Sequence, residues 1–250
     1  MAEIGLQLYT VRDHLQKDFI GTLGKVAEIG YRHLEFAGYG NMAAKDLRKA
    51  LDDLGLRAVS AHAGAVLREP LREIEYAQEL GIAYLVFPWL PEEMRRHVED
   101  YRALGERLNE VGATCAAHGI TLCYHNHAFE FERVTQSGEY GFDLLYAAAA
   151  PENLQAELDT YWIERADLSA IEYLDKMAGR CPLAHLKDMA AGDGREFAEL
   201  GAGILPIADI AAAARKAGAR YLFVEQDICR RDSLESVAAS LAFLKREGIM

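Results

Sequence analysis

The chain has 250 residues, of which 51% are hydrophobic and 26% are charged, and its formal net charge is -12. This composition is typical of a soluble globular protein. The acidic balance argues against sequence-independent nucleic-acid binding, which requires clustered Lys and Arg side chains. We find no apolar run near the roughly 18 residues of a membrane span and no signal-peptide pattern. We therefore expect a cytoplasmic protein with no membrane partner and no nucleic-acid partner.

Short apolar runs of strand length alternate along the chain with longer amphipathic segments. The predicted strands are residues 4–10, 33–38, 57–64, 83–90, 121–129, 154–162, 181–189 and 221–228. The predicted helices are residues 22–30, 44–55, 71–81, 92–118, 205–218 and 232–248. Three of them end at Gly30, Gly55 and Gly81, as expected where a chain leaves a helix in the left-handed conformation.

Eight strand segments in sequence, most followed by a helical segment, predict a parallel sheet with right-handed crossovers. A length of 250 residues favours closure of such a sheet into a (β/α)8 TIM barrel. An open doubly wound sheet is the alternative, but no G-x-G-x-x-G motif follows the first predicted strand. Because no linker or low-complexity tract divides the sequence, we predict one α/β domain over residues 1–250.

Ionisable side chains gather near the ends of the predicted strands, where a barrel of this kind carries its active site. Neutral imidazole and carboxylate groups are ligands for Mn²⁺, Co²⁺, Zn²⁺ or Mg²⁺, so the set suits a divalent metal. Each of these residues alone has a structural explanation, and Asp159 could simply cap the following turn. The ionisable residues concerned are Glu35, His62, His125, His127, Glu130, Asp159, His185, Lys187, Glu225 and Asp227, and Trp89 and Trp162 lie at the same strand ends.

Seven phrases give the sequence a resemblance to a known family. They are IGLQLYTVRD, GYRHLEFAGYG, YHNHAFEF, LDTYW, HLKD, ELGAGILP and VEQD, in this order along nearly the whole chain. The chain resembles the sugar phosphate isomerase/epimerase family of the xylose isomerase-like TIM barrel superfamily. That resemblance implies a (β/α)8 barrel with one divalent metal ion at its mouth, bound by Asp159, His185 and Glu225. The fourth ligand position, on the fifth strand, is a glutamate in the ketose epimerases and His125 here.

The replacement by His125 affects the mechanism that the resemblance implies. In the ketose epimerases the two metal-bound glutamates are also the proton-transfer bases. With His125 as a metal ligand, the second base would be His127 or Glu130, and a one-base isomerisation or a β-elimination gains credibility. Trp162 is a second departure, because the epimerases have a substrate-binding histidine there.

We therefore predict a metal-dependent sugar isomerase or epimerase that abstracts a proton next to a carbonyl through an enediolate. Glu225 is the first candidate base, with His127 or Glu130 as the second, and Lys187 would stabilise the oxyanion. Substrate contacts are predicted for Glu35, His62, Trp89 and Trp162, and metal ligation for His125, Asp159, His185 and Glu225.

Two other functions are compatible with this sequence. A lyase or dehydratase acting on a keto-sugar, keto-inositol or 3-keto-glycoside would use the same site with a His-rich fifth strand. An endonuclease IV-like DNA repair enzyme would need further metal ligands, and Trp162 stands at one of those positions. The expected partner is a small sugar or polyol. Whether the substrate is phosphorylated and which metal ion binds stay open. The oligomeric state is also open, and a homo-oligomer is one option.

Overall fold

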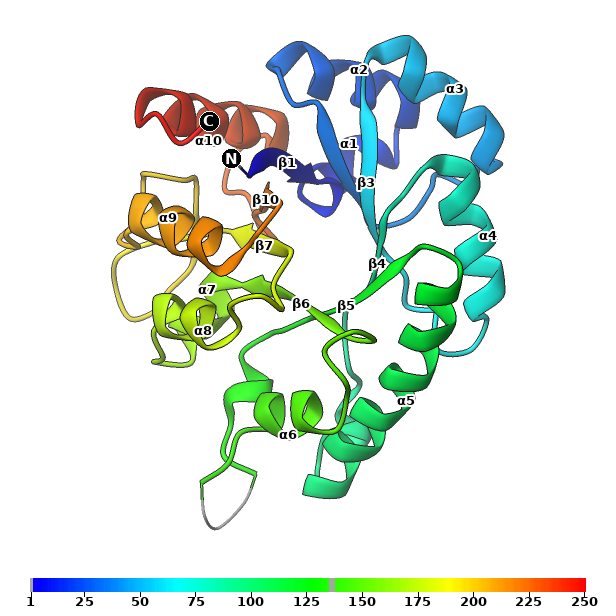
Figure 1. The fold of residues 1–250 in the computed structure, drawn as a ribbon. Helices are drawn as coiled ribbons and strands as arrows, with labels where there is room; N and C mark the ends of the chain where they lie inside the picture. The colour runs from blue at the N-terminus through cyan, green and yellow to red at the C-terminus, as the bar shows by residue number, and fades with distance from the viewer. Residues whose placement is uncertain (1, 135–137) are drawn as a thin grey trace.

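The computed structural model describes residues 2–134 and 138–250, and eight of its strands form a closed parallel barrel (Figure 1). The spatial order is β1-β10-β7-β6-β5-β4-β3-β2, so β10 closes the barrel against β1. The predicted (β/α)8 barrel is thereby confirmed. The barrel strands are β1 (Glu3–Gln7), β2 (His33–Phe36), β3 (Arg57–His62), β4 (Tyr84–Phe87), β5 (Thr121–His125), β6 (Gln155–Asp159), β7 (Leu183–Leu186) and β10 (Tyr221–Val224).

Helices surround the barrel and bury one face each. In α3, Ala44, Leu47 and Leu51 are buried at the spacing that places side chains on one helical face. The predicted glycine ends are confirmed at Gly55 and Gly81, whose φ angles are 66° and 82°. The longer helices are α2 (Phe19–Ile29), α3 (Ala44–Leu54), α4 (Pro70–Leu80), α5 (Val98–Ala117), α9 (Ile207–Ala217) and α10 (Ser233–Arg246).

Shorter helical segments lie in the loops that follow the strands. They are η1 (Leu8–Val11), α1 (Arg12–Leu15), η2 (Glu92–Met94), η3 (Phe129–Phe131), α6 (Gly141–Ala147), α7 (Thr160–Arg165) and α8 (Ala170–Lys176). The sequence analysis assigned no helix to the last three segments. They have only six or seven residues each, too few for a clear helical period.

Several predicted strands are too long at their C-terminal ends. β5 ends at His125, and β6 ends at Asp159, whose carboxylate accepts a hydrogen bond from the Trp162 N–H and so caps α7. β7 ends at Leu186, after which β8 (Asp188–Met189) pairs antiparallel with β9 (Phe197–Ala198). The polar tails of the predicted strands are therefore loops and helix starts above the barrel.

The barrel interior changes from apolar to ionisable along the strands. Its apolar part consists of Val59, Tyr84, Val86, Cys123, Leu183 and Phe223. Gly5 leaves room for this layer, because a Cβ atom there would lie 2.5 Å from the Phe223 ring. Inward-facing positions recur every second residue. The next inward residues after Cys123, Leu183 and Phe223 are therefore His125, His185 and Glu225, at the C-terminal end of the barrel.

The loop after β9 is fixed by a buried carboxylate. Asp188 accepts hydrogen bonds from the backbone N–H groups of Gly201, Gly203 and Leu205, at 2.9, 3.0 and 3.1 Å. A Cβ atom at Gly203 would lie 2.2 Å from Asp188 Oδ1, so this position requires glycine. The phrases HLKD and ELGAGILP thus meet in one structural unit.

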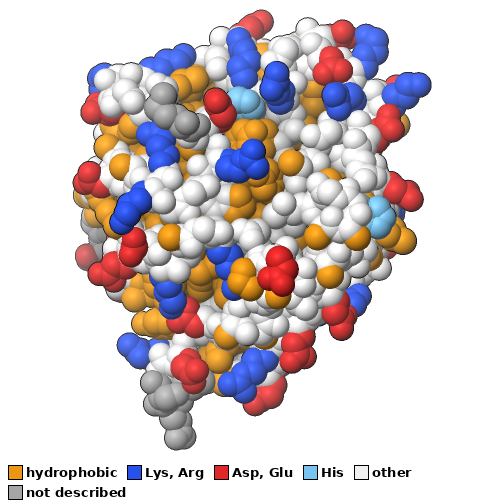
Figure 2. Space-filling view, in the orientation of Figure 1, with side chains coloured by type: hydrophobic (Ala, Val, Ile, Leu, Met, Phe, Trp, Pro, Cys, Tyr) orange, Lys and Arg blue, Asp and Glu red, His pale blue; other side chains and the backbone are white. Residues whose placement is uncertain are grey.

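The molecular surface carries charges of both signs. Acidic and basic side chains are interspersed over the face shown in Figure 2. Within the described part of the chain, no helix combines the length and apolar character that crossing a membrane requires.

Candidate metal centre and active site

A cavity of about 490 Å³ lies at the C-terminal ends of the barrel strands. It receives side chains from or just after β1, β2, β3, β4, β5, β7 and β10, so residues far apart in the sequence converge there. Five predicted site residues with ionisable groups, and Trp89, are among those that line it. The lining residues are Tyr9, Ala37, His62, Pro88, Trp89, His125, His127, Lys187, Glu225 and Asp227.

The Lys187 ammonium group lies at the mouth among three carboxylates. Lys187 Nζ is 2.7 Å from Asp159 Oδ2, 2.6 Å from Glu225 Oε2 and 2.8 Å from Asp227 Oδ1. Burial disfavours the ammonium charge, but Asp159 and Glu225 hold the pKa of Lys187 well above its usual range. Burial also opposes ionisation of Glu225, yet Lys187 and His185 keep the pKa of that carboxyl group below its usual range. Lys187 is therefore a fixed positive charge beside the cavity.

Asp227 is the outermost of these three carboxylates. Its side chain is 21% exposed, whereas those of Asp159 and Glu225 are 0% and 4% exposed. Burial raises the pKa of Asp227 to about 6, against the attraction of Lys187. A carboxyl group with a pKa near neutrality is suited to proton transfer, so Asp227 is a candidate base that the sequence analysis left without a role.

A second group of ionisable side chains lies deeper in the barrel, centred on Glu157. Glu157 Oε2 is 2.9 Å from His62 Nε2, 3.1 Å from His125 Nδ1 and 3.3 Å from His185 Nε2. Burial, reinforced by the charge of Glu35, raises the pKa of Glu157. The sequence analysis missed Glu157, although its position two residues before Asp159 on β6 already placed both side chains on one face.

Glu35 lies beside this group and is fully buried. It accepts hydrogen bonds from Gln7 Nε2 at 2.8 Å and Ser60 Oγ at 2.5 Å, and Glu35 Oε1 is 2.6 Å from His185 Nε2. Burial opposes its charge, but His62 and His185 hold the pKa of Glu35 well below its usual range. Glu35, one of the predicted substrate contacts, is not among the residues that line the cavity. It therefore lies deeper in the barrel than His62 and Trp89, which do line it.

Two overlapping sets of donor atoms could bind a metal ion in this region. In each set, one donor atom from every residue lies within 4.8 Å of the others. We call His125, Asp159, His185 and Glu225 the mouth set, which is the set predicted from the sequence. We call His62, His125, Glu157 and His185 the deep set, which the sequence analysis did not anticipate.

His127 and Glu130, the two candidates for a second base, occupy different environments. His127 lines the cavity; burial and the nearby Lys187 charge lower the pKa of His127 to about 3. Glu130 is fully buried below the loop, and it accepts hydrogen bonds from Tyr124 Oη at 2.6 Å and from the His127 N–H at 2.8 Å. Burial raises the pKa of Glu130 to about 7, although the Tyr124 hydroxyl opposes the shift. Glu130 therefore positions the His127 loop and does not face the cavity.

The two tryptophans also differ in position. Trp89 lines the cavity with 51% of its surface exposed. Trp162 lies in α7 with its ring centroid 5.6 Å from that of His127 and 5.8 Å from Lys187 Nζ. Since Trp162 does not line this cavity, its predicted contact with substrate would require a larger ligand or a local rearrangement.

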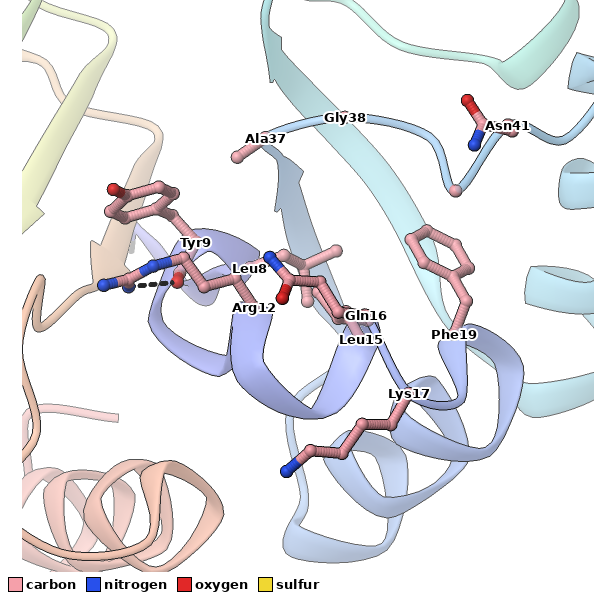
Figure 3. Close-up of a pocket in the computed structure, with 11 residues that line it drawn as sticks. Leu8, Tyr9, Arg12, Leu15, Gln16, Lys17, Phe19, Ala37, Gly38 and Asn41 are labelled. Carbon is pink, nitrogen blue, oxygen red and sulfur yellow. Dashed lines mark hydrogen bonds between the residues drawn. The ribbon is translucent and has the colours of Figure 1, made fainter.

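A second cavity of about 480 Å³ adjoins the first and shares Tyr9 and Ala37 with it. Figure 3 shows that it lies between η1 and α1 on one side and the segment after β2, from Ala37 to Asn41, on the other. Arg12 stands at the end near Tyr9, where its guanidinium carbon is 4.0 Å from the Tyr9 ring centroid. The Lys17 side chain extends away from the segment that carries Ala37, Gly38 and Asn41 (Figure 3).

The fold and the site together define a class of protein: a parallel (β/α)8 barrel whose C-terminal mouth holds buried histidines and carboxylates. A family model described as xylose isomerase-like TIM barrel matches residues 23–247. The chain therefore belongs to the xylose isomerase-like TIM barrel family, and the resemblance found in the sequence is confirmed.

Solved structures agree with this assignment. The chain is similar over 100% of its length to 99% of a sugar phosphate isomerase/epimerase from Parabacteroides distasonis, with 25% identity and a TM-score of 0.85. A second protein so described from that organism is 27% identical over 99% of this chain and 95% of the other, with a TM-score of 0.83.

A more distant structure, the IolI protein with a bound zinc atom, shares the fold. It is 14% identical over 97% of both chains, with a TM-score of 0.76. A comparison with curated proteins finds no match.

Proposed function

We propose that this chain is a divalent-metal-dependent sugar isomerase or epimerase that abstracts a proton from carbon next to a carbonyl group. The observation that carries the proposal is the placement of Glu225 and His127 on the wall of one cavity, beside a buried set of metal-binding groups. The likeness to two proteins described as sugar phosphate isomerase/epimerases supports the same class of reaction.

The mouth set fits one ion of Mn²⁺, Co²⁺, Zn²⁺ or Mg²⁺. It offers two imidazole nitrogens and two carboxylate oxygens, the donor types that such ions take in proteins. Asp159 Oδ2 accepts no hydrogen bond of good geometry from the described residues, although Lys187 contacts it as an ion pair. When bound, the ion would act as a Lewis acid toward the substrate's carbonyl and hydroxyl oxygens.

The chain's own residues would supply the proton transfer. Glu225 is ionised beside Lys187 and faces the cavity, so its carboxylate would accept the proton. The second base would be His127, whose buried Nδ1 atom has no hydrogen bond to any described residue, or Asp227, whose carboxyl group on the same cavity wall has a pKa of about 6. Lys187 would stabilise negative charge that develops on the substrate oxygen. His62 and Trp89 would contact the hydroxyl groups and the face of the sugar.

The test of this proposal is the variant Glu225→Gln, with Glu235→Gln as a matched control in the first turn of α10. Loss of a positioned general base typically costs 10²–10⁴ in rate. We expect Glu225→Gln to lose at least about 100-fold in kcat on a panel of Mn²⁺-supplemented ketoses and keto-polyols, with an unchanged circular dichroism spectrum. Full activity in a folded Glu225→Gln enzyme would refute the assignment of the base.

The second cavity favours one alternative, a lyase acting on a two-part substrate such as a 3-keto-glycoside. A keto-sugar would occupy the cavity at the barrel mouth, and a leaving group would extend past Tyr9 and Ala37 toward Arg12. Proton abstraction by the same Glu225 would then lead to β-elimination. Release of the leaving group from such a substrate, measured by chromatography, distinguishes the lyase from the isomerase.

A further inference from the structure

The deep set has the geometry of a cation-binding site in its own right. The nitrogens of His62, His125 and His185 converge from three strands on one oxygen, Glu157 Oε2, at 2.9–3.3 Å. Glu35 Oε1 adds a further oxygen, 2.6 Å from His185 Nε2 and 3.3 Å from His62 Nε2. These side chains are 0–13% exposed. One donor atom from each of His62, His125, Glu157 and His185 thus lies within 4.8 Å of the others, and Glu35 lies beside them.

Hydrogen bonds alone satisfy this arrangement poorly. Three imidazoles can bond to one carboxylate oxygen only if each presents an N–H toward it. His185 Nε2 must in addition serve both Glu35 Oε1 and Glu157 Oε2. Glu157 Oε1, which is buried, accepts no hydrogen bond from the residues that the structure describes. A divalent cation among the donors would remove the need for these protons.

Charge compensation also differs between the two sets. At the mouth, the Lys187 ammonium group contacts Asp159 and Glu225 and offsets part of their charge. Within the described residues, the ion pairs of Glu35 and Glu157 are formed with histidines alone, and no Lys or Arg reaches them. Charge compensation of these two buried carboxylates therefore depends on imidazole groups, which become metal ligands once they are neutral. A divalent cation could take the place of imidazole protons in the deep set, whereas at the mouth it would compete with the Lys187 ammonium group.

We propose that the deep set, assisted by Glu35, binds a divalent transition-metal ion more tightly than the mouth set does. Three imidazole nitrogens with carboxylate oxygen favour a borderline ion such as Zn²⁺ or Co²⁺ over Mg²⁺. His125 and His185 face the mouth set through their other ring nitrogens, since His125 Nε2 is 3.7 Å from Asp159 Oδ2 and His185 Nδ1 is 2.8 Å from Glu225 Oε2. An ion in the deep set would thus also orient the two imidazoles of the proposed catalytic site.

The test compares variants that belong to only one set. The full chain is stripped with chelator and titrated calorimetrically with Zn²⁺ or Co²⁺, for wild type, His62→Asn, Glu157→Gln and Glu225→Gln. We expect the tightest site to lose at least about 100-fold in affinity in His62→Asn and Glu157→Gln, and to stay within threefold of wild type in Glu225→Gln. X-ray absorption of the single-zinc protein should show three imidazole ligands, whereas the mouth set offers two.

Loss of the tight ion in Glu225→Gln with its retention in His62→Asn would overturn this inference, as would an absorption spectrum with two imidazoles. A wild-type protein that binds neither ion would overturn it as well. Circular dichroism checks that each variant folds. His62 has the most exposed side chain of the deep set, so His62→Asn keeps the test usable if Glu157→Gln does not fold. The inference does not depend on the reaction: a tight deep ion without turnover on any keto-sugar refutes the proposed function alone.

Discussion

Replacing Lys187 with Met should destabilise the metal-free protein strongly, because it leaves three acidic groups in the barrel mouth without their cation. Lys187 Nζ lies 2.6–2.8 Å from oxygens of Asp159, Glu225 and Asp227. At an effective dielectric constant of ~20, one such contact corresponds to roughly 6 kcal/mol of Coulomb attraction. Most of that is offset by the desolvation of Lys187, and breaking a buried ion pair typically costs about 3–5 kcal/mol in net stability.

The assay for Lys187→Met is urea unfolding in the presence of chelator, repeated with excess Mn²⁺ or Zn²⁺. We expect the free energy of unfolding to fall by about 3–5 kcal/mol without the ion. The melting temperature should fall by roughly 6–20 °C for a chain of this length. Added ion should restore part of the loss, because it can neutralise the same carboxylates. A loss below about 1 kcal/mol, or no response to the ion, would refute the view of Lys187 as the charge that balances this site.

Two further predictions concern the buried layers. In the folded protein Glu130 has a pKa of about 7, above its ordinary value of 4.5, so its contribution to stability is full below pH 4.5 and lost as the pH rises to about 7. Glu130→Gln should therefore remove up to about 3 kcal/mol of the decline in unfolding free energy over that range, and identical slopes in wild type and variant would disprove it. Gly5→Ala should cost about 1–3 kcal/mol in urea unfolding, because its Cβ atom meets the Phe223 ring. Adding Phe223→Leu should recover part of the loss, and a Gly5→Ala protein as stable as wild type would contradict this packing.

Most of the fold could be predicted from the sequence because each barrel strand reads as a short apolar run. The ends of the strands could not be predicted, since residues such as His127 and Trp162 continue the pattern of the run in the sequence while the chain already turns. Asp159 illustrates the difficulty, because one carboxylate caps α7, contacts Lys187 and belongs to the mouth set. Its capping role was foreseen, but its contact with Lys187 depends on β7 lying beside β6.

The structure brings the predicted mouth set together, whereas the deep set was not predicted from the sequence. The sequence pointed to His125, His185 and Glu225 because each lies in a recognisable phrase, YHNHAFEF, HLKD or VEQD. Glu157 was overlooked even though the two-residue period of β6 places it on the face of Asp159. The burial of Glu35 and Glu130 below the cavity could not be predicted from the sequence. It depends on hydrogen bonds that Ser60 of β3 donates to Glu35 and that Tyr124 of β5 donates to Glu130.

Proton exchange in D₂O tests the central claim most directly. The metal-loaded enzyme is incubated in D₂O with ketoses, keto-inositols and 3-keto-glycosides, and deuterium on the carbon next to the carbonyl is measured by NMR. Our account predicts deuterium incorporation that requires the divalent ion and is lost in Glu225→Gln. No incorporation into any of these substrates by folded, metal-loaded enzyme, or equal incorporation in Glu225→Gln, would contradict proton abstraction by this site.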